Sequence, residues 1–234
     1  MNDSNKKQYF NSLGEKFDEY MSDYDVARRK ELIFDRLLKN KPLKGKRILE
    51  IGCGTGKFSA VISKNGAMLT VLDIGPRLVS DVVSAYDCLG TSGDATILPF
   101  KSDSFDAIVS SECIEHTPDP TAAIQEMCRV CKPGGVVCFT TPNRLWFPLL
   151  LLSEWLGIRK FSGIENWIYP TRGIATLKAA KMTTIHADGC HLWPFQLKMS
   201  RPLLRRMDIY GKFLFPFMIN FGLVAVKSRE KIEP

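Results

Sequence analysis

The chain has 234 residues, of which 45% are hydrophobic and 24% are charged, a composition typical of a globular protein with a full apolar core. Its length fits one domain better than two, so we predict a single domain over 1–234. The longest purely apolar run, 145–152, contains Pro148 and is far shorter than the ~20 residues of a membrane-spanning helix. Residues 1–10 lack the apolar segment of a secretory signal. Seven cysteines without regular spacing argue against a disulfide framework and favour a reduced, cytoplasmic setting.

The formal net charge of +7 is distributed unevenly along the chain. Residues 1–143 carry 18 basic and 19 acidic side chains, whereas residues 144–234 carry 14 and 6. The basic part also contains two apolar, aromatic runs, at 146–152 and 213–218. One interpretation is an acidic or lipid-like substrate, or docking at an anionic membrane surface. The other is a buried core segment with a solvated basic face.

The predicted elements alternate between strands and helices. Two helices with apolar periodicity come first, at 5–20 and 25–39, and are expected to form a lid over the site. We predict strands at 47–51, 68–72, 89–92, 105–110, 136–140, 183–187 and 221–227, and further helices at 57–64, 76–86, 120–131 and 171–180. The strands are apolar with little alternation, as expected when helices cover both faces of a parallel sheet. The fold class is therefore a doubly wound α/β sheet.

A glycine-rich loop follows the first predicted strand. Gly52, Gly54 and Gly56 alternate with other residues, which lets the backbone turn tightly and approach a ligand closely. Asp73 follows the next strand, where an acid can bind the hydroxyls of a ribose. The G-x-G-x-G spacing differs from the dinucleotide pattern, and the Glu50 carboxylate beside it would repel a pyrophosphate but suits an ammonium group. These residues favour S-adenosylmethionine over NAD.

Four ordered blocks over 46–143 carry a family resemblance. They are the glycine loop, the G-D-A at 93–95 with L-P-F at 98–100, the F-D-A-I-V-S-S at 105–111, and the K-P-G-G at 132–135 that leads into 136–139. With these blocks the chain resembles the class I S-adenosylmethionine-dependent methyltransferases. The resemblance implies a mostly parallel, seven-stranded, Rossmann-like sheet whose final strand is antiparallel.

The resemblance also implies which residues contact the cofactor. Asp73 would hold the ribose hydroxyls, Ile74 would pack on the adenine, and Ser111 would flank the sulfonium. Arg28 resembles an arginine that some relatives aim at the methionine carboxylate; Arg29 is nearly as good a choice, and a solvated helix face is the alternative for both. The full set is Glu50, Gly52, Cys53, Gly54, Gly56, Asp73, Ile74, Asp94, Ala95, Ser111 and Arg28.

A second group of polar residues follows the strand at 105–110. If Glu112, Glu115 and His116 lie on one helical turn, their side chains share a face and could bind Mg²⁺ or Mn²⁺. This E-x-x-E-H resembles the metal motif of ubiquinone-biosynthesis O-methyltransferases. The alternative is a metal-free role at the start of a helix or in acid–base chemistry, with Asp119 and Pro120 truncating the turn. His116 and Glu115 are therefore the candidate catalytic residues.

Two further segments have specific interpretations. Cys128 and Cys131 form a single C-x-x-C without a second ligand pair, so we predict buried helix residues rather than a zinc site. The Trp- and Leu-rich stretch at 143–170 follows a strand at the ligand-binding edge of the sheet. We expect the chain to divide into a helical lid (1–42), a cofactor-binding core (43–143), a substrate-shaping insert and helix (144–182) and the last strands (183–234).

Together these patterns predict an S-adenosylmethionine-dependent methyltransferase acting on a small, partly hydrophobic molecule at oxygen. Two alternatives stay open: C- or N-methylation of a lipid-linked or sugar precursor, and a non-catalytic S-adenosylmethionine-binding module at a membrane surface. Nucleic acid is not the expected substrate, because Ser110-Ser111-Glu112-Cys113 stands where amino-methylating relatives carry an Asn/Asp-Pro-Pro-aromatic block. Basic charge alone is a poor argument for nucleic-acid binding.

Overall fold

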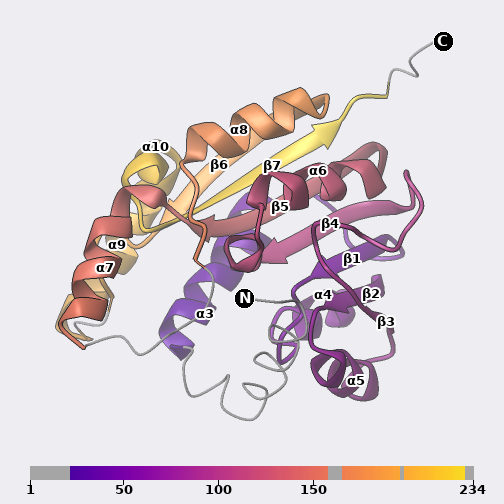
Figure 1. Cartoon of the computed structure of the whole chain (residues 1–234), viewed down its shortest axis with the longest axis horizontal. Coiled ribbons are helices and arrows are strands. Elements are labelled where there is room, and N and C mark those ends of the chain that lie inside the picture. The colour runs from indigo at the N-terminus through magenta and orange to yellow at the C-terminus, as the bar shows by residue number, and fades with distance from the viewer. Residues whose placement is uncertain (1–21, 158–164, 196–197, 230–234) are drawn as a thin grey trace.

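The computed structural model describes residues 22–157, 165–195 and 198–229 (Figure 1). The helix predicted at 5–20 lies outside the described residues. The described residues form one sheet of seven strands in the order β3-β2-β1-β4-β5-β7-β6. β7 is antiparallel to both of its neighbours, and the other pairs are parallel. The strands are β1 (Arg47–Ile51), β2 (Met68–Asp73), β3 (Leu89–Ser92), β4 (Phe105–Ser111), β5 (Cys131–Pro142), β6 (Met182–Cys190) and β7 (Asn220–Lys227).

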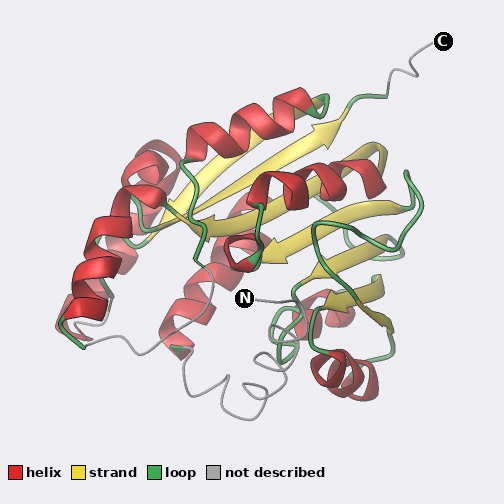
Figure 2. Cartoon of the chain, in the orientation of Figure 1, coloured by secondary structure: helices red, strands yellow, loops and turns green. Residues whose placement is uncertain are grey.

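Helices connect the strands and cover the sheet on both sides (Figure 2). The longer ones are α3 (Asp23–Lys30), the π-helix η1 (Glu31–Leu37), α4 (Ser59–Lys64), α5 (Pro76–Ala85), α6 (Pro120–Val130), α7 (Phe147–Trp155), α8 (Pro170–Ala179), α9 (Arg201–Met207) and α10 (Gly211–Leu214). Short 3₁₀ segments are η2 (Ile114–His116), η3 (Arg144–Trp146), η4 (Lys198–Ser200), η5 (Asp208–Tyr210) and η6 (Phe215–Phe217). Among the described residues, every helix falls short of the length and apolarity that a bilayer crossing requires.

The core has two apolar layers, one on each face of the sheet. Successive residues of β1 alternate between them: Leu49 and Ile51 belong to one cluster and Ile48 to the other. Ile124 of α6 and Leu177 of α8 complete the first cluster, and η1, α4 and α5 complete the second. The predicted doubly wound fold with helices on both faces is confirmed.

Several helix boundaries follow from local chemistry. Pro120 occupies the first turn of α6, where its missing N–H costs nothing, and the Asp119 carboxylate accepts hydrogen bonds from the backbone N–H groups of Thr121 and Ala122. Cys128 lies in α6 as predicted, but Cys131 begins β5, because its backbone is extended and pairs with Phe105 of β4. The prediction that both cysteines belong to a helix was therefore wrong for Cys131.

The strand order positions the site. β1 lies between β2 and β4, so the strand order reverses beside β1: β2 and β3 lie on one side of it, and β4 and β5 lie on the other. In open α/β sheets the ligand crevice lies at such a reversal, at the carboxyl ends of the strands. The register pairs Ile51 with Leu72 on one side and with Ser110 on the other. The residues that follow these three strands therefore emerge side by side.

Candidate cofactor and active site

The glycine loop adopts a backbone that only glycine accommodates well. Gly52, Gly54 and Gly56 have φ angles of 75°, 49° and 80°, in the left-handed region. A Cβ added to Gly52 would lie 2.6 Å from both Cβ and Sγ of Cys113. The loop thus packs its backbone against the polypeptide that leaves β4, and the predicted tight turn is present.

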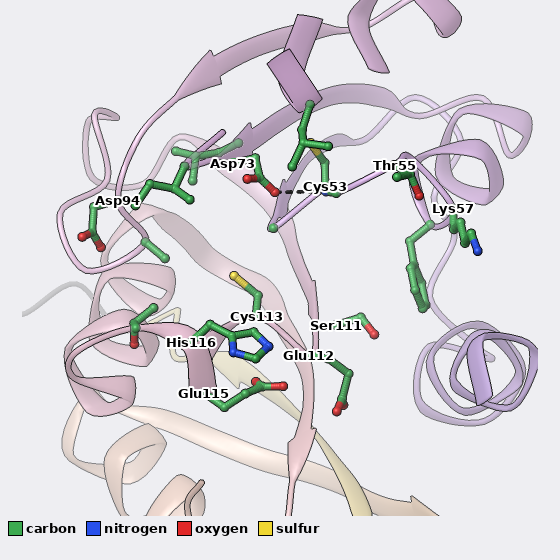
Figure 3. A pocket seen from close by; sticks show the side chains of 18 of the residues that line it. Cys53, Thr55, Lys57, Asp73, Asp94, Ser111, Glu112, Cys113, Glu115 and His116 are labelled. Atoms are coloured by element: carbon green, nitrogen blue, oxygen red, sulfur yellow. Dashed lines mark hydrogen bonds between the residues drawn. The ribbon is translucent and has the colours of Figure 1, made fainter. Parts of the chain in front are cut away.

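Asp73 ties the loop to the end of β2. One carboxylate oxygen accepts a hydrogen bond from the Gly54 N–H at 3.0 Å (Figure 3). The other accepts one from the Gly75 N–H at 2.9 Å. The residue is only 7% exposed, and burial raises its pKa while these backbone donors oppose the rise. Because a carboxylate offers about four acceptor positions, it retains capacity for ribose hydroxyls.

A cavity of about 290 Å³ lies at this edge of the sheet. Residues predicted from the sequence supply much of its wall: Gly52, Cys53, Gly54, Asp73, Ile74, Asp94, Ala95, Ser111, Glu112, Glu115 and His116. In Figure 3, Asp73 and Asp94 lie in the upper part of the view, and Glu115 and His116 lie below them. The glycine loop, an oriented acid and an open crevice fit an adenosyl cofactor.

Glu50, Gly56 and Arg28 are not among the lining residues. Glu50 is 3% exposed, and its carboxylate accepts a hydrogen bond from the Ser59 hydroxyl on α4. Burial raises the pKa of Glu50 to about 8. Its side chain lies behind the loop, on the face of β1 that α4 covers, so the predicted contact with an ammonium group has no support in this geometry.

Arg29, rather than Arg28, reaches the cavity from α3. The Arg29 guanidinium forms a salt bridge with Asp25 at 2.8 Å and donates a hydrogen bond to the Ser111 hydroxyl at 3.2 Å. Arg28 turns the other way and binds the buried Asp208 carboxylate through Nη2 at 2.8 Å. Neither arginine lies on a solvated helix face, because both are 5% exposed.

The geometry does not assemble the metal site predicted from Glu112, Glu115 and His116. Glu112 has a left-handed backbone (φ 51°) and η2 spans only three residues, so the segment is not the regular helical turn that the prediction required. Asn220 donates a hydrogen bond to Glu112 at 2.7 Å, and Thr141 donates one to Glu115 at 3.1 Å. Within 22–157, 165–195 and 198–229, no group of three or more His, Cys, Asp or Glu side chains is arranged to hold a metal ion.

Both of these carboxyl groups are buried in the wall of the cavity. Glu115 is 1% exposed, and burial raises its pKa. Burial also raises the pKa of Glu112 well above the usual range, with the Glu115 charge as the next cause. Glu112 Oε1 is buried without a hydrogen-bond partner. This wall of the cavity therefore favours protonated carboxyl groups next to His116.

Some lining residues were not predicted. Phe58 lies two residues after Gly56, and this closeness to the glycine loop could have identified it as a lining residue. Trp167 lies in the stretch expected to shape a substrate site. Asp25 comes from α3 and is held by Arg29 and by the ring of the buried His191, whose Nε2 lies 3.0 Å from Asp25 Oδ1. Nothing in the sequence links His191 to Asp25, because 166 positions separate them.

Comparison with known proteins agrees with this geometry. A family model described as "Methyltransferase domain" matches residues 20–179, more than half of the chain. A ubiquinone biosynthesis O-methyltransferase of Xanthomonas oryzae pv. oryzae (strain PXO99A) is 36% identical over 110 residues, 44% of this chain and 45% of the relative. The chain thus matches less than half the length of this relative.

Solved structures share the fold. A complex between the Haloferax volcanii Trm112 methyltransferase activator and a methyltransferase gives a TM-score of 0.69 at 18% identity, covering 94% of this chain and 97% of that one. A SAM-dependent methyltransferase of Methanosarcina mazei gives 0.62 at 19% identity, covering 82% and 97%. The matched domain, the sheet topology and the cavity at the glycine loop agree. The chain therefore belongs to the methyltransferase-domain family of class I, S-adenosylmethionine-dependent proteins.

Proposed function

We propose that the chain transfers a methyl group from S-adenosylmethionine to an oxygen atom of a small, partly hydrophobic molecule. The observation that carries the proposal is one cavity with two chemically different walls. The glycine loop and Asp73 form one wall, and Glu115, His116 and Trp167 belong to the other. The first suits an adenosyl cofactor and the second an acceptor that has a ring and a hydroxyl group.

Specific side chains are available for each part of the cofactor. The Asp73 carboxylate would accept the ribose hydroxyls, and Ile74 would pack against the adenine. Asp94 would accept the adenine amino group, and its orientation is fixed because Thr96 donates both its N–H (2.8 Å) and its hydroxyl (2.7 Å) to Oδ1. Arg29 takes the role predicted for Arg28 and would bind the methionine carboxylate.

The bound cofactor supplies an electrophilic methyl group on sulfur. The chain has to hold the acceptor oxygen in line with that methyl group and exclude water, and positioning of this kind contributes up to about 7–11 kcal/mol in well-oriented reactions. As the new C–O bond forms, the acceptor hydroxyl must lose its proton. His116 or the ionised form of Glu115 would accept it, since both line the wall that faces the acceptor.

Oxygen is favoured as the acceptor atom because the matched relative is named as an O-methyltransferase. The side chains of Glu112, Glu115 and His116 are not grouped as ligands of a divalent cation. We therefore assign the proton transfer to protein side chains, in place of the metal chemistry suggested by the E-x-x-E-H pattern. C- or N-methylation of a lipid-linked precursor is the second candidate. The exposed leucines of α7, next to the segment that carries Trp167, favour it.

Two measurements test the proposal. Calorimetric titration should give a binding heat with S-adenosylmethionine and none with NADH. Transfer of a radiolabelled methyl group should then be screened over phenols, catechols, amines and carbon acids of graded hydrophobicity, and we expect phenolic or catecholic oxygen to be labelled. Binding of NADH would contradict the cofactor assignment. Cofactor binding with no transfer to any acceptor would favour the non-catalytic module instead.

A further inference from the structure

Two neighbouring helical segments present large apolar side chains to solvent. We propose that they form a docking surface for an anionic lipid membrane; this inference does not depend on the methyl-transfer reaction. The α7–η6 surface is defined by its exposed apolar side chains: Leu149, Leu151, Leu152, Trp155, Leu156, Leu203, Ile209, Tyr210, Phe213 and Phe217.

The side chains of α7 are not part of the core. In the helix Phe147–Trp155 only Leu150 is buried, whereas Leu151 and Leu152 are about half exposed and Trp155 is 82% exposed. A surface helix normally carries polar residues on its outer face. Here leucines occupy that face, and exposed apolar patches of this kind mark interaction sites.

The second segment, 201–217, is a nearly continuous helical run through α9, η5, α10 and η6. Leu204, Asp208 and Gly211 are buried and spaced four and three residues apart, so they define the face of this run that packs inward. The apolar side chains on the rest of the run, such as Phe213 at 76% exposure and Phe217, therefore have no place in the core. The exposed apolar side chains do not fit the alternative of a buried core segment with a solvated basic face.

The two segments lie side by side at one end of the molecule. The Trp146 indole N–H donates a hydrogen bond to the Phe217 carbonyl at 2.9 Å, and the Asn143 side chain donates one to the Pro216 carbonyl at 2.8 Å. Figure 1 shows α7 next to α9 and α10, away from α5 at the other end of the sheet. Their exposed residues can therefore meet one partner together.

The charge of the surface identifies the partner. Residues 144–157 and 199–217 contain five basic side chains, four of them exposed: Arg144, Arg205, Arg206 and Lys212. They contain two acidic residues, and one of these, Asp208, is buried in its ion pair with Arg28. Basic side chains around apolar ones match an anionic bilayer surface, at which Trp and Tyr also accumulate. A second copy of this chain would instead bring like charges together.

The surface also adjoins the cavity. The ring of Phe147, at the start of α7, packs edge-on against Trp167 with 5.7 Å between ring centroids, and Trp167 lines the cavity. Arg144 donates a hydrogen bond to the Trp167 carbonyl at 3.4 Å. Docking through α7 would therefore place the acceptor wall close to the lipid, from which an apolar acceptor can enter.

The test is co-sedimentation of the full chain with vesicles of phosphatidylcholine alone or of phosphatidylcholine with phosphatidylglycerol. Three variants probe the surface: Leu152→Ser/Trp155→Ser and Phe213→Ser remove apolar contacts, and Arg205→Glu/Arg206→Glu reverses charge. Leu89→Ser and Lys39→Glu/Lys44→Glu are matched controls at exposed positions elsewhere. Circular dichroism and S-adenosylmethionine binding verify that each variant is folded.

We expect the wild type to sediment with the anionic vesicles and not with the neutral ones. The surface variants should lose at least roughly tenfold in partitioning, whereas the controls should match the wild type. Failure of the wild type to bind anionic vesicles would overturn the proposal, and so would undiminished binding by folded surface variants. A wild-type dimer that Leu152→Ser/Trp155→Ser dissociates, without vesicle binding, would show that a second copy covers this surface.

Discussion

Arg29 on α3 donates a hydrogen bond to the Ser111 hydroxyl at the end of β4, 3.2 Å away across 82 positions of sequence. The same guanidinium forms a salt bridge with Asp25. This contact connects the helix that precedes the sheet to the edge where β1, β2 and β4 end. It makes α3 a wall of the cavity, so substitutions in this helix should affect cofactor binding.

Arg29 and Arg28 should respond differently to substitution. We expect Arg29→Lys to weaken S-adenosylmethionine binding by roughly tenfold, because lysine keeps the charge but loses the planar fork of donors. Arg28→Lys should leave cofactor affinity nearly unchanged and lower the free energy of unfolding, because it disturbs the buried pair with Asp208. Calorimetry and chemical denaturation of both variants measure these effects. The assignment fails if Arg28→Lys is the variant that loses affinity.

Asp73 is expected to be necessary for cofactor binding. Asp73→Asn keeps the shape of the side chain but removes the charge, and it should weaken binding about tenfold or more, since charge-assisted hydrogen bonds contribute about 1.5–3 kcal/mol. Asp81→Asn, on the exposed face of α5, is the control and should bind normally. Calorimetric titration measures both. Equal affinity in the two variants would contradict a ribose-binding role.

Gly52→Ala and Gly45→Ala form a matched pair. Both glycines have positive φ angles, 75° and 69°, but an added Cβ would strike Cys113 at position 52 and meets nothing within 4 Å at position 45. We expect a loss of about 2–4 kcal/mol of unfolding free energy for Gly52→Ala and about 1 kcal/mol for Gly45→Ala. Urea unfolding measures both. Equal losses would mean that backbone strain, not the close approach to Cys113, requires glycine.

Glu50 should make stability depend on pH. Its pKa is about 8 in the folded chain, above the ordinary value of 4.5, because of burial. Between these values the folded state holds a proton that the unfolded state has released, so stability is full below about pH 4.5 and falls as pH rises toward 8. Glu50→Gln should remove the contribution of Glu50 to this dependence and gain stability relative to the wild type at pH 9, while Glu112 and Glu115, whose pKa values burial also raises, keep their contributions. Denaturation curves at pH 5 and pH 9 measure the free energy of unfolding of both proteins. An equal loss of stability between pH 5 and pH 9 in the wild type and in Glu50→Gln would contradict the role of Glu50.

Proton transfer without a metal leads to a further prediction. Methyl transfer should persist in EDTA, and Glu112→Gln should retain cofactor binding, because the described carboxylates do not form a metal-binding group. The substitution that removes the proton acceptor, His116→Ala or Glu115→Gln, should lower kcat by roughly 10²-fold or more with little effect on cofactor affinity. Loss of turnover in EDTA with recovery on Mg²⁺ addition would refute the metal-free scheme.

Features that depend on residues close together in the chain could be predicted from the sequence. The alternating glycines with Asp73, the proline-led helix α6 and the apolar strands each depend on residues close in sequence, so spacing alone located them within a few residues. Side-chain orientations that depend on a neighbouring element could not be predicted. Glu50 points toward α4 because alternate β1 residues face opposite layers. The choice between Arg28 and Arg29 depends on how α3 packs, with Arg28 against Asp208 of η5 and Arg29 against Ser111 of β4.

The sequence by itself determined the sheet, the glycine loop and the class of cofactor, because a strand followed by positive-φ glycines and an acid leaves few alternatives. Only the tertiary structure decided that Glu112, Glu115 and His116 do not converge as a metal site. A left-handed residue and a three-residue helix interrupt the assumed turn, and Asn220 and Thr141, distant in sequence, take the carboxylate oxygens. Side-chain partners of this kind are set by packing between elements, which spacing along one chain does not encode.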